Sequence, residues 1–263
     1  MIKYAYLETT NHCNLECSFC NRDEVIGPLK HITLENWAKL LDKIKHHPIE
    51  TAKLMGMGEP ILHPQFDEIL RMFKETFPNC FVIVATNCQY PIDEDTKMGQ
   101  KFRKALQYVN MLYLSIDGYQ ESYERDRKPA KWSKLMNFLN ILPTIDRKGC
   151  KIVINYVVNA YNIQDIEKVD ALRFLYKLET LRLNIAQIWD QSTSIEDNIA
   201  TSGYSQDQLD YLRENWKENI MGKESWDYEN CYWVNEGLYT TVEGNVKMCC
   251  MNTGAKPVGN IFE

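Results

Sequence analysis

The chain is organised around a cysteine-rich stretch near its N-terminus, Glu8-Thr9-Thr10-Asn11-His12-Cys13-Asn14-Leu15-Glu16-Cys17-Ser18-Phe19-Cys20. Three cysteines fall there in a C-x3-C-x2-C run. Thiolates spaced this closely are typical ligands of a metal ion or an iron–sulfur cluster. A [4Fe–4S] cubane has four iron corners, and this loop supplies only three thiolates. The fourth iron would therefore stay open to bind a substrate or a cofactor.

The same stretch allows a zinc site, which needs a fourth Cys or His at a recognisable spacing. His12 is one residue from Cys13, a poor geometry for sharing one metal ion. The other histidines fall in predicted loops and helices, and nothing in the sequence groups them: His31, His46, His47 and His63. Structural disulfides are not expected in a chain with nine cysteines and no secretory signal. We therefore favour an open iron–sulfur cluster, with zinc as the alternative.

Length and composition limit the class of protein. At 263 residues, the chain suits one barrel-sized domain with a small appendage, and 44% hydrophobic with 25% charged residues is ordinary for a soluble protein. The net charge of −6 argues against a general binder of nucleic acid or of anionic membranes. The longest apolar runs, such as Ile152–Val158, have the length of a strand and not of a membrane span. We expect a cytoplasmic protein with reduced thiols.

Six strand–helix repeats follow one another along the chain. The predicted strands are Tyr4–Thr9, Lys53–Met55, Phe81–Ala85, Met111–Ser115, Lys151–Val158 and Leu181–Ile185. Between them, apolar residues recur at helical spacing, for example Trp37, Leu40, Leu41 and Ile44 after a plausible N-cap at Thr33. Such alternation predicts an α/β fold with a parallel sheet, and six units fall short of a closed eight-stranded barrel.

Polar residues and glycines gather where the predicted strands end. They are Gly56-Met57-Gly58-Glu59-Pro60, Thr86-Asn87, Ser115 with Asp117, Asn155 with Asn159, and Arg182 with Asn184. Ligand sites of parallel α/β folds lie at this edge of the sheet. Asn, Asp and Gly are also what ordinary turns use, so ligand and turn roles both stay open. An Arg inside the barrel needs a partner, either an anionic ligand or a salt bridge.

The cysteine run, with Phe19 before its last cysteine, resembles the signature loop of the radical S-adenosylmethionine (radical SAM) superfamily. The resemblance implies a partial (β/α)6 TIM-type barrel and a [4Fe–4S] cluster on Cys13, Cys17 and Cys20 as the catalytic centre. SAM would chelate the open iron and be cleaved by one electron to a 5′-deoxyadenosyl radical. Gly58-Glu59-Pro60 resembles the family's GGEP motif. The SAM contacts that the resemblance implies are Phe19, Gly56, Gly58, Glu59, Asn87, Ser115, Asp117 and Asn159.

The pattern changes after the sixth strand. A polar stretch is followed by a predicted helix at Ser205–Met221 and by two strands around Glu243-Gly244-Asn245, a hairpin with cysteines at its base. This segment resembles a SPASM or twitch domain, which carries an auxiliary cluster; the ligands would be Cys231, Cys249 and Cys250. Such domains usually supply further cysteines after the Gly259-Asn260 element, where this sequence ends. The alternative is a structural hairpin. We divide the chain at residues 1–200 and 201–263, with the second domain open to being truncated.

These features predict a radical SAM enzyme that abstracts hydrogen from a small sugar-like or cyclitol-like substrate, as a net oxidation. The short C-terminal module resembles that of a family dehydrogenase that oxidises an aminocyclitol, and no peptide-recognition domain precedes the cysteine loop. A peptide-modifying maturase is the alternative, and so is an epimerase with Cys88 or Cys250 as hydrogen donor. Outside this class stands a non-catalytic iron–sulfur or zinc protein. The expected partner is a one-electron donor such as flavodoxin or ferredoxin, with neither nucleic acid nor membrane. Cys80 and Cys150 are expected to act as small buried hydrophobic residues.

Overall fold

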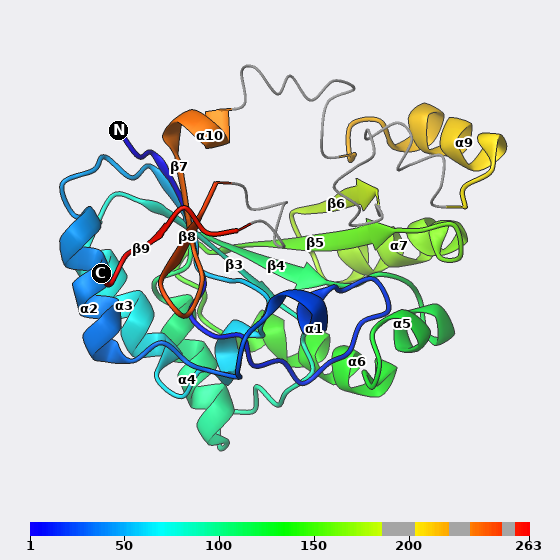
Figure 1. Ribbon diagram of the computed structural model, residues 1–263. Helices are drawn as coiled ribbons and strands as arrows, with labels where there is room; N and C mark the ends of the chain where they lie inside the picture. Colours follow the sequence, from blue (N-terminus) through cyan, green and yellow to red (C-terminus); the bar gives the residue numbers. More distant parts are fainter. Residues whose placement is uncertain (186–202, 221–231, 249–255) are drawn as a thin grey trace.

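A computed structural model describes residues 1–185, 203–220, 232–248 and 256–263 (Figure 1). The predicted auxiliary ligands Cys231, Cys249 and Cys250 lie outside these residues. The described strands form one sheet in the order β6-β5-β4-β3-β2-β1-β7-β8-β9. They are β1 (Tyr4–Leu7), β2 (Thr51–Lys53), β3 (Phe81–Thr86), β4 (Met111–Ser115), β5 (Lys151–Val158), β6 (Thr180–Ile185), β7 (Gly237–Thr240), β8 (Asn245–Lys247) and β9 (Gly259–Asn260).

Strands β1 to β6 are parallel to their neighbours, and helices connect them in sequence. The sheet runs open from β6 at one edge to β9 at the other. This arrangement confirms the predicted partial barrel. Strand β2 lies two residues earlier than predicted, because the backbone N–H of Thr51 already pairs with the carbonyl of Lys3 at 3.2 Å. The N-terminal strand ends at Leu7, before the predicted Thr9.

The α-helices are α1 (Arg22–Val25), α2 (Leu34–Ile44), α3 (Phe66–Thr76), α4 (Lys97–Leu106), α5 (Glu121–Asp126), α6 (Trp132–Ile141), α7 (Ile166–Leu175), α9 (Gln206–Trp216) and α10 (Tyr232–Glu236). Short 3-10 turns lie at η1 (Pro60–Leu62), η2 (Leu142–Thr144) and η3 (Ile163–Asp165). The predicted N-cap of α2 is confirmed, because the hydroxyl of Thr33 accepts the N–H of Asn36 at 3.1 Å. No helix among the described residues has the length and apolar character to cross a membrane.

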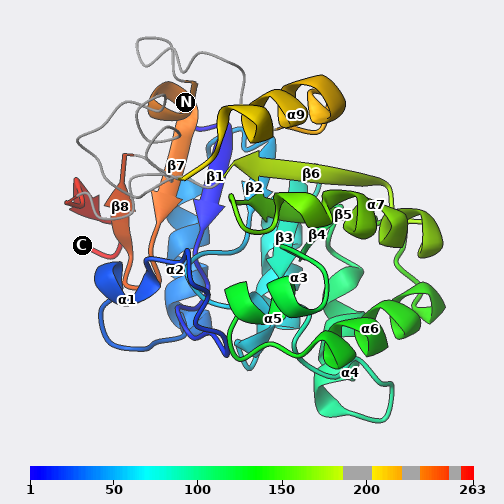
Figure 2. The same ribbon diagram turned by 90° about the vertical axis from the view of Figure 1, so that its right-hand side faces the viewer.

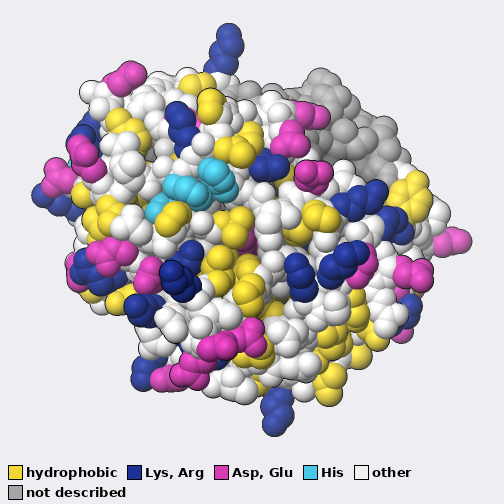
Figure 3. Space-filling view, turned by 90° about the horizontal axis from the view of Figure 1, so that it is seen from below, with side chains coloured by type: hydrophobic (Ala, Val, Ile, Leu, Met, Phe, Trp, Pro, Cys, Tyr) yellow, Lys and Arg dark blue, Asp and Glu magenta, His cyan; other side chains and the backbone are white. Residues whose placement is uncertain are grey.

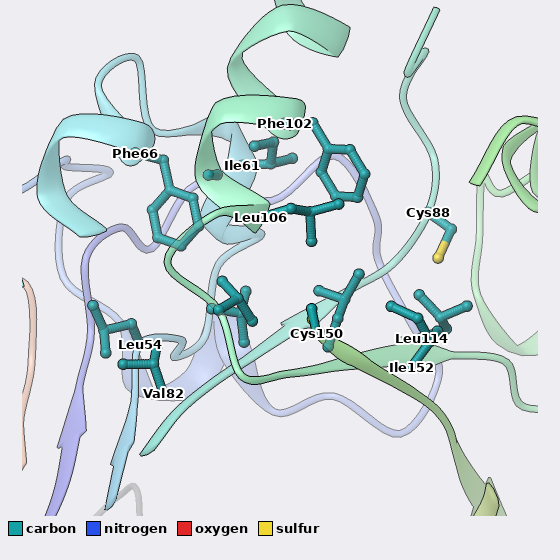
Figure 4. Packing of buried hydrophobic residues seen from close by; sticks show 14 of the residues in the cluster. Leu54, Ile61, Phe66, Val82, Cys88, Phe102, Leu106, Leu114, Cys150 and Ile152 are labelled. Carbon is teal, nitrogen blue, oxygen red and sulfur yellow. The ribbon is translucent and has the colours of Figure 1, made fainter. Parts of the chain in front are cut away.

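Each strand turns alternate side chains toward the helices and toward the opposite, inner face of the sheet. Val82 of β3 and Ile152 of β5 face Phe66 and Phe102 of the helix layer (Figure 4). The alternate residues Ile83, Tyr113 and Val153 form a separate apolar cluster. Because the period of a strand is two residues, this second cluster lies on the inner face.

The three thiols without an assigned function lie in the core, as predicted. Cys80, Cys88 and Cys150 are all buried among hydrophobic residues, and Cys88 has no exposed surface at all. In Figure 4, Cys88 lies on the helix side of the sheet with Leu114 and Ile152. The suggestion that Cys88 donates hydrogen from a cavity therefore does not match its position.

The C-terminal segment extends the barrel sheet. Strand β7 pairs in parallel with β1, so that Tyr239 lies opposite Tyr6. The predicted hairpin is confirmed between β7 and β8, and its turn uses Gly244 at a φ of +87°, which favours glycine. Figure 2 shows β7, β1 and β2 side by side, with α1 below them. The C-terminal hairpin therefore lies next to the strand that leads into the cysteine loop.

Candidate iron–sulfur and SAM site

The cysteine loop follows β1 and is held at the carboxyl edge of the sheet by backbone hydrogen bonds. The N–H of Glu16 donates to the carbonyl of Lys128 at 2.5 Å, and the N–H of Ser18 donates to that of Asp126 at 2.8 Å. Asp126 is the last residue of α5 and Lys128 lies just after the helix, so the segment after β4 fixes the middle of the loop. Cys13 and Cys17 are partly buried, whereas Cys20 is exposed.

Two side chains point N–H groups at the thiols. Nδ2 of Asn87 lies 3.9 Å from Sγ of Cys13, and it also donates to Oδ1 of Asn14 at 2.7 Å. Nη1 of Arg127 lies 3.9 Å from Sγ of Cys17. Hydrogen bonds to sulfur and nearby positive charge are the means by which proteins tune the potential of an iron–sulfur cluster.

The partly buried thiols of Cys13 and Cys17 keep their protons until a metal ion binds. Burial raises the pKa of Cys13, and it raises the pKa of Cys17 to about 12, although the charge of Arg127 acts in the opposite direction. The charge of Cys20 also raises the pKa of Cys13, and the charges of Cys20 and Cys13 raise the pKa of Cys17. At neutral pH, Cys13 and Cys17 of the metal-free loop are therefore neutral thiols, and binding of iron must release their protons.

The described residues contain no group of three His, Cys, Asp or Glu side chains that could hold a metal ion. A cubane places a different thiolate at each iron corner, so its ligands lie farther apart than those of a mononuclear site. Three thiols on one loop, with two N–H donors beside them, are the donor set that such a cluster takes. We find that the residues present fit a three-cysteine cluster.

A buried ion pair supports Arg127. The guanidinium pairs with the carboxylate of Asp117, which has no exposed surface. The other carboxylate oxygen of Asp117 accepts the N–H of Val157 at 2.7 Å. The guanidinium also lies 5.5 Å from the ring centre of Phe19. The carboxylate of Asp117 thus pairs with Arg127 and with the backbone of β5, and its contact with SAM stays a prediction.

The Gly56–Pro60 loop packs against the start of the cysteine loop. A Cβ on Gly58 would lie 2.4 Å from the carbonyl oxygen of Thr10 and 2.5 Å from that of His12. The N–H of Glu59 donates to the same carbonyl of His12 at 2.8 Å. Gly58 is therefore required for the close approach of two chain segments. The contact of Gly58 with SAM, which the resemblance implies, stays a prediction.

The carboxylate of Glu59 is buried and hydrogen-bonded to the backbone. Oε2 of its carboxylate accepts the N–H of Asn87 at 2.7 Å, and burial raises the pKa of the carboxyl to about 7. Asn87 itself closes a turn by accepting the N–H of Gln89 at 2.9 Å. One carboxylate thus joins the loop after β2 to the end of β3, and Asn87 continues the chain of contacts to Cys13.

The other predicted SAM residues lie at the same edge. Ser115 is partly exposed at the end of β4 and lies in register with Asn155 of β5, whose Oδ1 accepts Nδ2 of Asn184 at 2.9 Å. Asn159 lies farther along, where its Nδ2 donates to Oδ2 of Asp126 at 3.0 Å. Ser115, Asn155 and Asn184 therefore share the inner face, whereas Asn159 helps to hold the segment that fixes the cysteine loop.

The guanidinium of Arg182 contacts an aromatic residue of the same sheet. Its Nη1 donates to the hydroxyl of Tyr113 at 2.8 Å, and the guanidinium lies 5.2 Å from the centre of that ring. Its Nε is buried without a hydrogen-bond partner. No carboxylate among the described residues forms an ion pair with it. Among the described residues, Arg182 is thus partnered by Tyr113, and the two alternatives suggested by the sequence, a salt bridge and an anionic ligand, stay predictions.

Three features of the site were missed. Arg127 and Glu8 are buried charged residues whose partners come from distant segments, and the sequence carried no signal beyond their placement beside Asp126 and Leu7. Histidines that looked scattered form a row: the rings of His12 and His31 stack at 4.1 Å, and His63 lies 5.1 Å beyond. Figure 3 shows histidine side chains gathered on one face of the molecule, whereas His63 itself is buried. Burial, and then the charges of His12, His63 and Lys101, lower the pKa of His31 to about 4.

Comparison with known proteins agrees with this geometry. A model of the Radical SAM superfamily matches residues 7–172, which include the cysteine loop, the Gly56–Pro60 loop and Ser115. The sporulation killing factor maturation protein SkfB of Bacillus subtilis is 22% identical over 272 residues, which cover 98% of this chain and 62% of that protein. The FeMo cofactor biosynthesis protein NifB of Chlorobaculum tepidum is 23% identical over 220 residues, 74% of this chain and 50% of that protein. The chain thus spans about half to two thirds of these relatives.

Solved structures share the fold at low sequence identity. Streptococcus suis SuiB bound to its precursor peptide SuiA matches with a TM-score of 0.73 and 14% identity, over 100% of this chain and 63% of that one. BtrN in complex with AdoMet and 2-DOIA matches with a TM-score of 0.59 and 12% identity, over 100% of this chain and 79% of that one.

Proposed function

The chain belongs to the radical SAM superfamily, whose members use a [4Fe–4S] cluster and SAM, and on that premise we propose that Cys13, Cys17 and Cys20 hold the cluster. The observation that carries the proposal is one loop with three free thiols and an N–H donor beside two of them. We further propose that SAM is held by Phe19, Gly56, Gly58, Glu59, Asn87, Ser115, Asp117 and Asn159. Asp117 and Asn159 would act from behind, through Arg127 and Asp126.

When bound, the cluster and SAM supply a 5′-deoxyadenosyl radical that takes a hydrogen atom from the substrate. The chain's own residues hold and shield the reactants. Asn87 and Arg127 orient the thiols of Cys13 and Cys17. The apolar inner-face cluster of Ile83, Tyr113 and Val153 keeps water from the side of the sheet where hydrogen is abstracted.

We propose a small polar molecule as substrate and a net oxidation as the reaction. Hydrogen-bonding side chains on the inner face support this class: the Asn155–Asn184 pair and the guanidinium of Arg182 with its unpartnered Nε. BtrN, which was solved with AdoMet and 2-DOIA, shares the fold. An auxiliary cluster on Cys231, Cys249 and Cys250, within a domain from residue 201 to 263, would accept the substrate electron.

A peptide maturase is the second candidate. It is favoured by the match to SkfB, which extends over 98% of this chain, and by the fold shared with SuiB, solved with a precursor peptide. An epimerase is less favoured, because Cys88 is buried on the helix side of the sheet. For all these reactions, we propose a cytoplasmic protein that receives single electrons from a flavodoxin-like or ferredoxin-like donor.

The test is anaerobic incubation of reconstituted protein with SAM and dithionite, followed by measurement of 5′-deoxyadenosine. Product is expected from the wild type and from Cys80→Ala, which removes a buried thiol that is not part of the cysteine loop. Cys17→Ala should give none. Protein that is loaded with iron but forms no 5′-deoxyadenosine at any strength of reductant would overturn the proposal and leave a non-catalytic iron–sulfur or zinc protein.

The auxiliary cluster has its own test, an iron count on the triple variant in which Cys13, Cys17 and Cys20 are all changed to Ala. About four irons per chain would support a second cluster and substrate oxidation. Near-zero iron would reduce the C-terminal cysteines to a structural hairpin and turn the search to redox-neutral chemistry. To separate the substrate classes, the wild type is incubated with SAM and either deuterated aminocyclitols or deuterated short peptides. Transfer of deuterium from the substrate into 5′-deoxyadenosine is the readout.

A further inference from the structure

Glu8 joins three segments that are far apart in the sequence. Oε1 of its carboxylate accepts the N–H of Met57 at 2.7 Å, and Oε2 accepts the N–H of Val242 at 3.0 Å. Its own N–H donates to the carbonyl of Thr240 at 3.0 Å. The side chain is only 3% exposed, so neither carboxylate oxygen has water as a ready substitute. One buried carboxyl group therefore connects the glycine loop after β2 to the C-terminal hairpin.

The glycine loop is shaped around this carboxylate. A Cβ on Gly56 would lie 2.4 Å from both Cγ and Oε1 of Glu8, so no side chain fits at that position. On the far side of Met57, Gly58 and Glu59 are fixed against the carbonyl of His12. The N–H of Met57 is thus held between two anchored glycines, and a shift of Glu8 would move the segment proposed to receive SAM.

The carboxylate of Glu8 is also enclosed on the side of the C-terminal hairpin. Glu8, Met57, Thr241, Glu243 and Lys247 line a cavity of about 20 Å³, room for one water molecule. Oγ1 of Thr241 and Oε1 of Glu243 are buried there without a hydrogen-bond partner in the protein. No basic side chain among the described residues forms an ion pair with Glu8. The two backbone N–H groups donate directly to its carboxylate, and the charge of Lys247 acts on it from the same cavity.

From this geometry, we propose that Glu8 is a positioning residue that couples docking of the C-terminal hairpin to binding of SAM. A buried carboxylate needs hydrogen bonds to stay ionised. Each of the two N–H groups stabilises the carboxylate charge to which the other N–H donates. Docking of the hairpin at Val242 therefore strengthens the hydrogen bond to Met57, and ordering of the loop at Met57 strengthens the hydrogen bond to Val242. Coupling of this kind is reciprocal by thermodynamic necessity. The inference rests on the proposed function, because it takes the glycine loop as part of the SAM site.

The experiment measures hydrogen exchange of the anaerobically reconstituted, full-length protein with and without SAM. In the wild type, SAM is expected to slow exchange of the amides at residues 240–245 by about tenfold, a coupling of ordinary size. In Glu8→Gln, the amide group can accept only one of the two N–H groups, and this protection should vanish. SAM should also bind about tenfold more weakly. The matched control is Glu236→Gln. The carboxylate of Glu236, which precedes β7, pairs with Lys3 near the surface, and this variant should behave as the wild type.

The outcomes separate the two proposals. A wild type that does not bind SAM contradicts the proposed function itself. A wild type that binds SAM without protecting residues 240–245 contradicts only the coupling, and that half of the experiment needs no variant. Protection that persists in Glu8→Gln would mean that SAM reaches the hairpin by another route, and the role of Glu8 would be overturned. If Glu8→Gln fails to fold, Glu8→Asp serves as the second variant, since a side chain shorter by one methylene draws the carboxylate away from the N–H groups of Met57 and Val242.

Discussion

Nη1 of Arg127 lies 3.9 Å from Sγ of Cys17, although the two residues are 110 positions apart in the sequence. The guanidinium reaches the thiol because its other face is ion-paired with Asp117, at the end of β4. The loop that carries the chemistry is therefore held by charge supplied from the middle of the barrel.

The Arg127–Asp117 pair gives the first prediction. Arg127→Met should lower the free energy of unfolding by about 3–5 kcal/mol, because it leaves a buried carboxylate without its partner. Adding Asp117→Asn should recover part of that loss, since the amide oxygen can still accept the N–H of Val157. Urea unfolding of the metal-free proteins measures both. A double variant no more stable than Arg127→Met would show that the buried charge is not the cause.

The same double variant should lower the reduction potential of the cluster, because Cys17 loses a nearby cation and an N–H donor. The potential is measured by redox titration followed by electron paramagnetic resonance. Arg125→Gln is the control, since Arg125 pairs with Asp126 and is not among the donors to the thiols. An unchanged potential in the double variant would mean that Arg127 serves the fold alone.

Asn87→Ala should destabilise the protein by about 1–3 kcal/mol and speed the loss of iron to a chelator. The variant removes the donor to Asn14 at 2.7 Å and the N–H beside Cys13. Asn140→Ala, which removes an exposed amide bonded to Tyr176, should change neither quantity by a comparable amount. Equal rates of iron loss in the two variants would contradict a role for Asn87 at the cluster.

Gly58→Ala should cost about 1–3 kcal/mol or more, because a Cβ would lie 2.4 Å from a backbone oxygen that cannot move independently. SAM binding, measured by titration calorimetry, should weaken with it. Gly259→Ala is the matched control: a Cβ there meets open space, and stability should change little. A stable Gly58→Ala protein with normal SAM affinity would show that the two loops can separate without harm.

Glu8 should make stability depend on pH. Burial raises the pKa of its carboxyl from 4.5 to about 7, while Glu243 raises and Lys247 lowers the same pKa from the hairpin. Because the folded state holds the proton of Glu8 more tightly than the unfolded one, the contribution of Glu8 to stability is largest below about pH 4.5. It then falls by up to about 1.4 kcal/mol per pH unit until about pH 7.

Glu8→Gln should remove that contribution. Glu59 has a pKa raised to about 7 as well, so the variant should retain roughly half of the pH dependence between pH 5 and 7. Urea unfolding of metal-free wild type and variant at pH 5, 6 and 7 measures the slope. An identical slope in both proteins would place the titration of Glu8 outside this range.

The sequence by itself determined the local and periodic features. The spacing of Cys13, Cys17 and Cys20 indicated the cluster, and the apolar periods located β4 and β5 at their observed bounds. Thr33 and the buried stripe of α2 followed from capping and helical spacing. These properties depend on neighbours within a few residues, so they can be read along the chain.

Only the tertiary structure decided how the charged residues are used. Asp117 and Glu59 are in the places where ligand contacts were predicted, yet their carboxylates hold Arg127 and the N–H of Asn87. Glu8 joins residues 57 and 242, and the histidine row joins residues 12, 31 and 63. A buried charge is stabilised by whichever groups the fold brings within hydrogen-bond distance, and those groups come from segments whose separation in the sequence carries no signal.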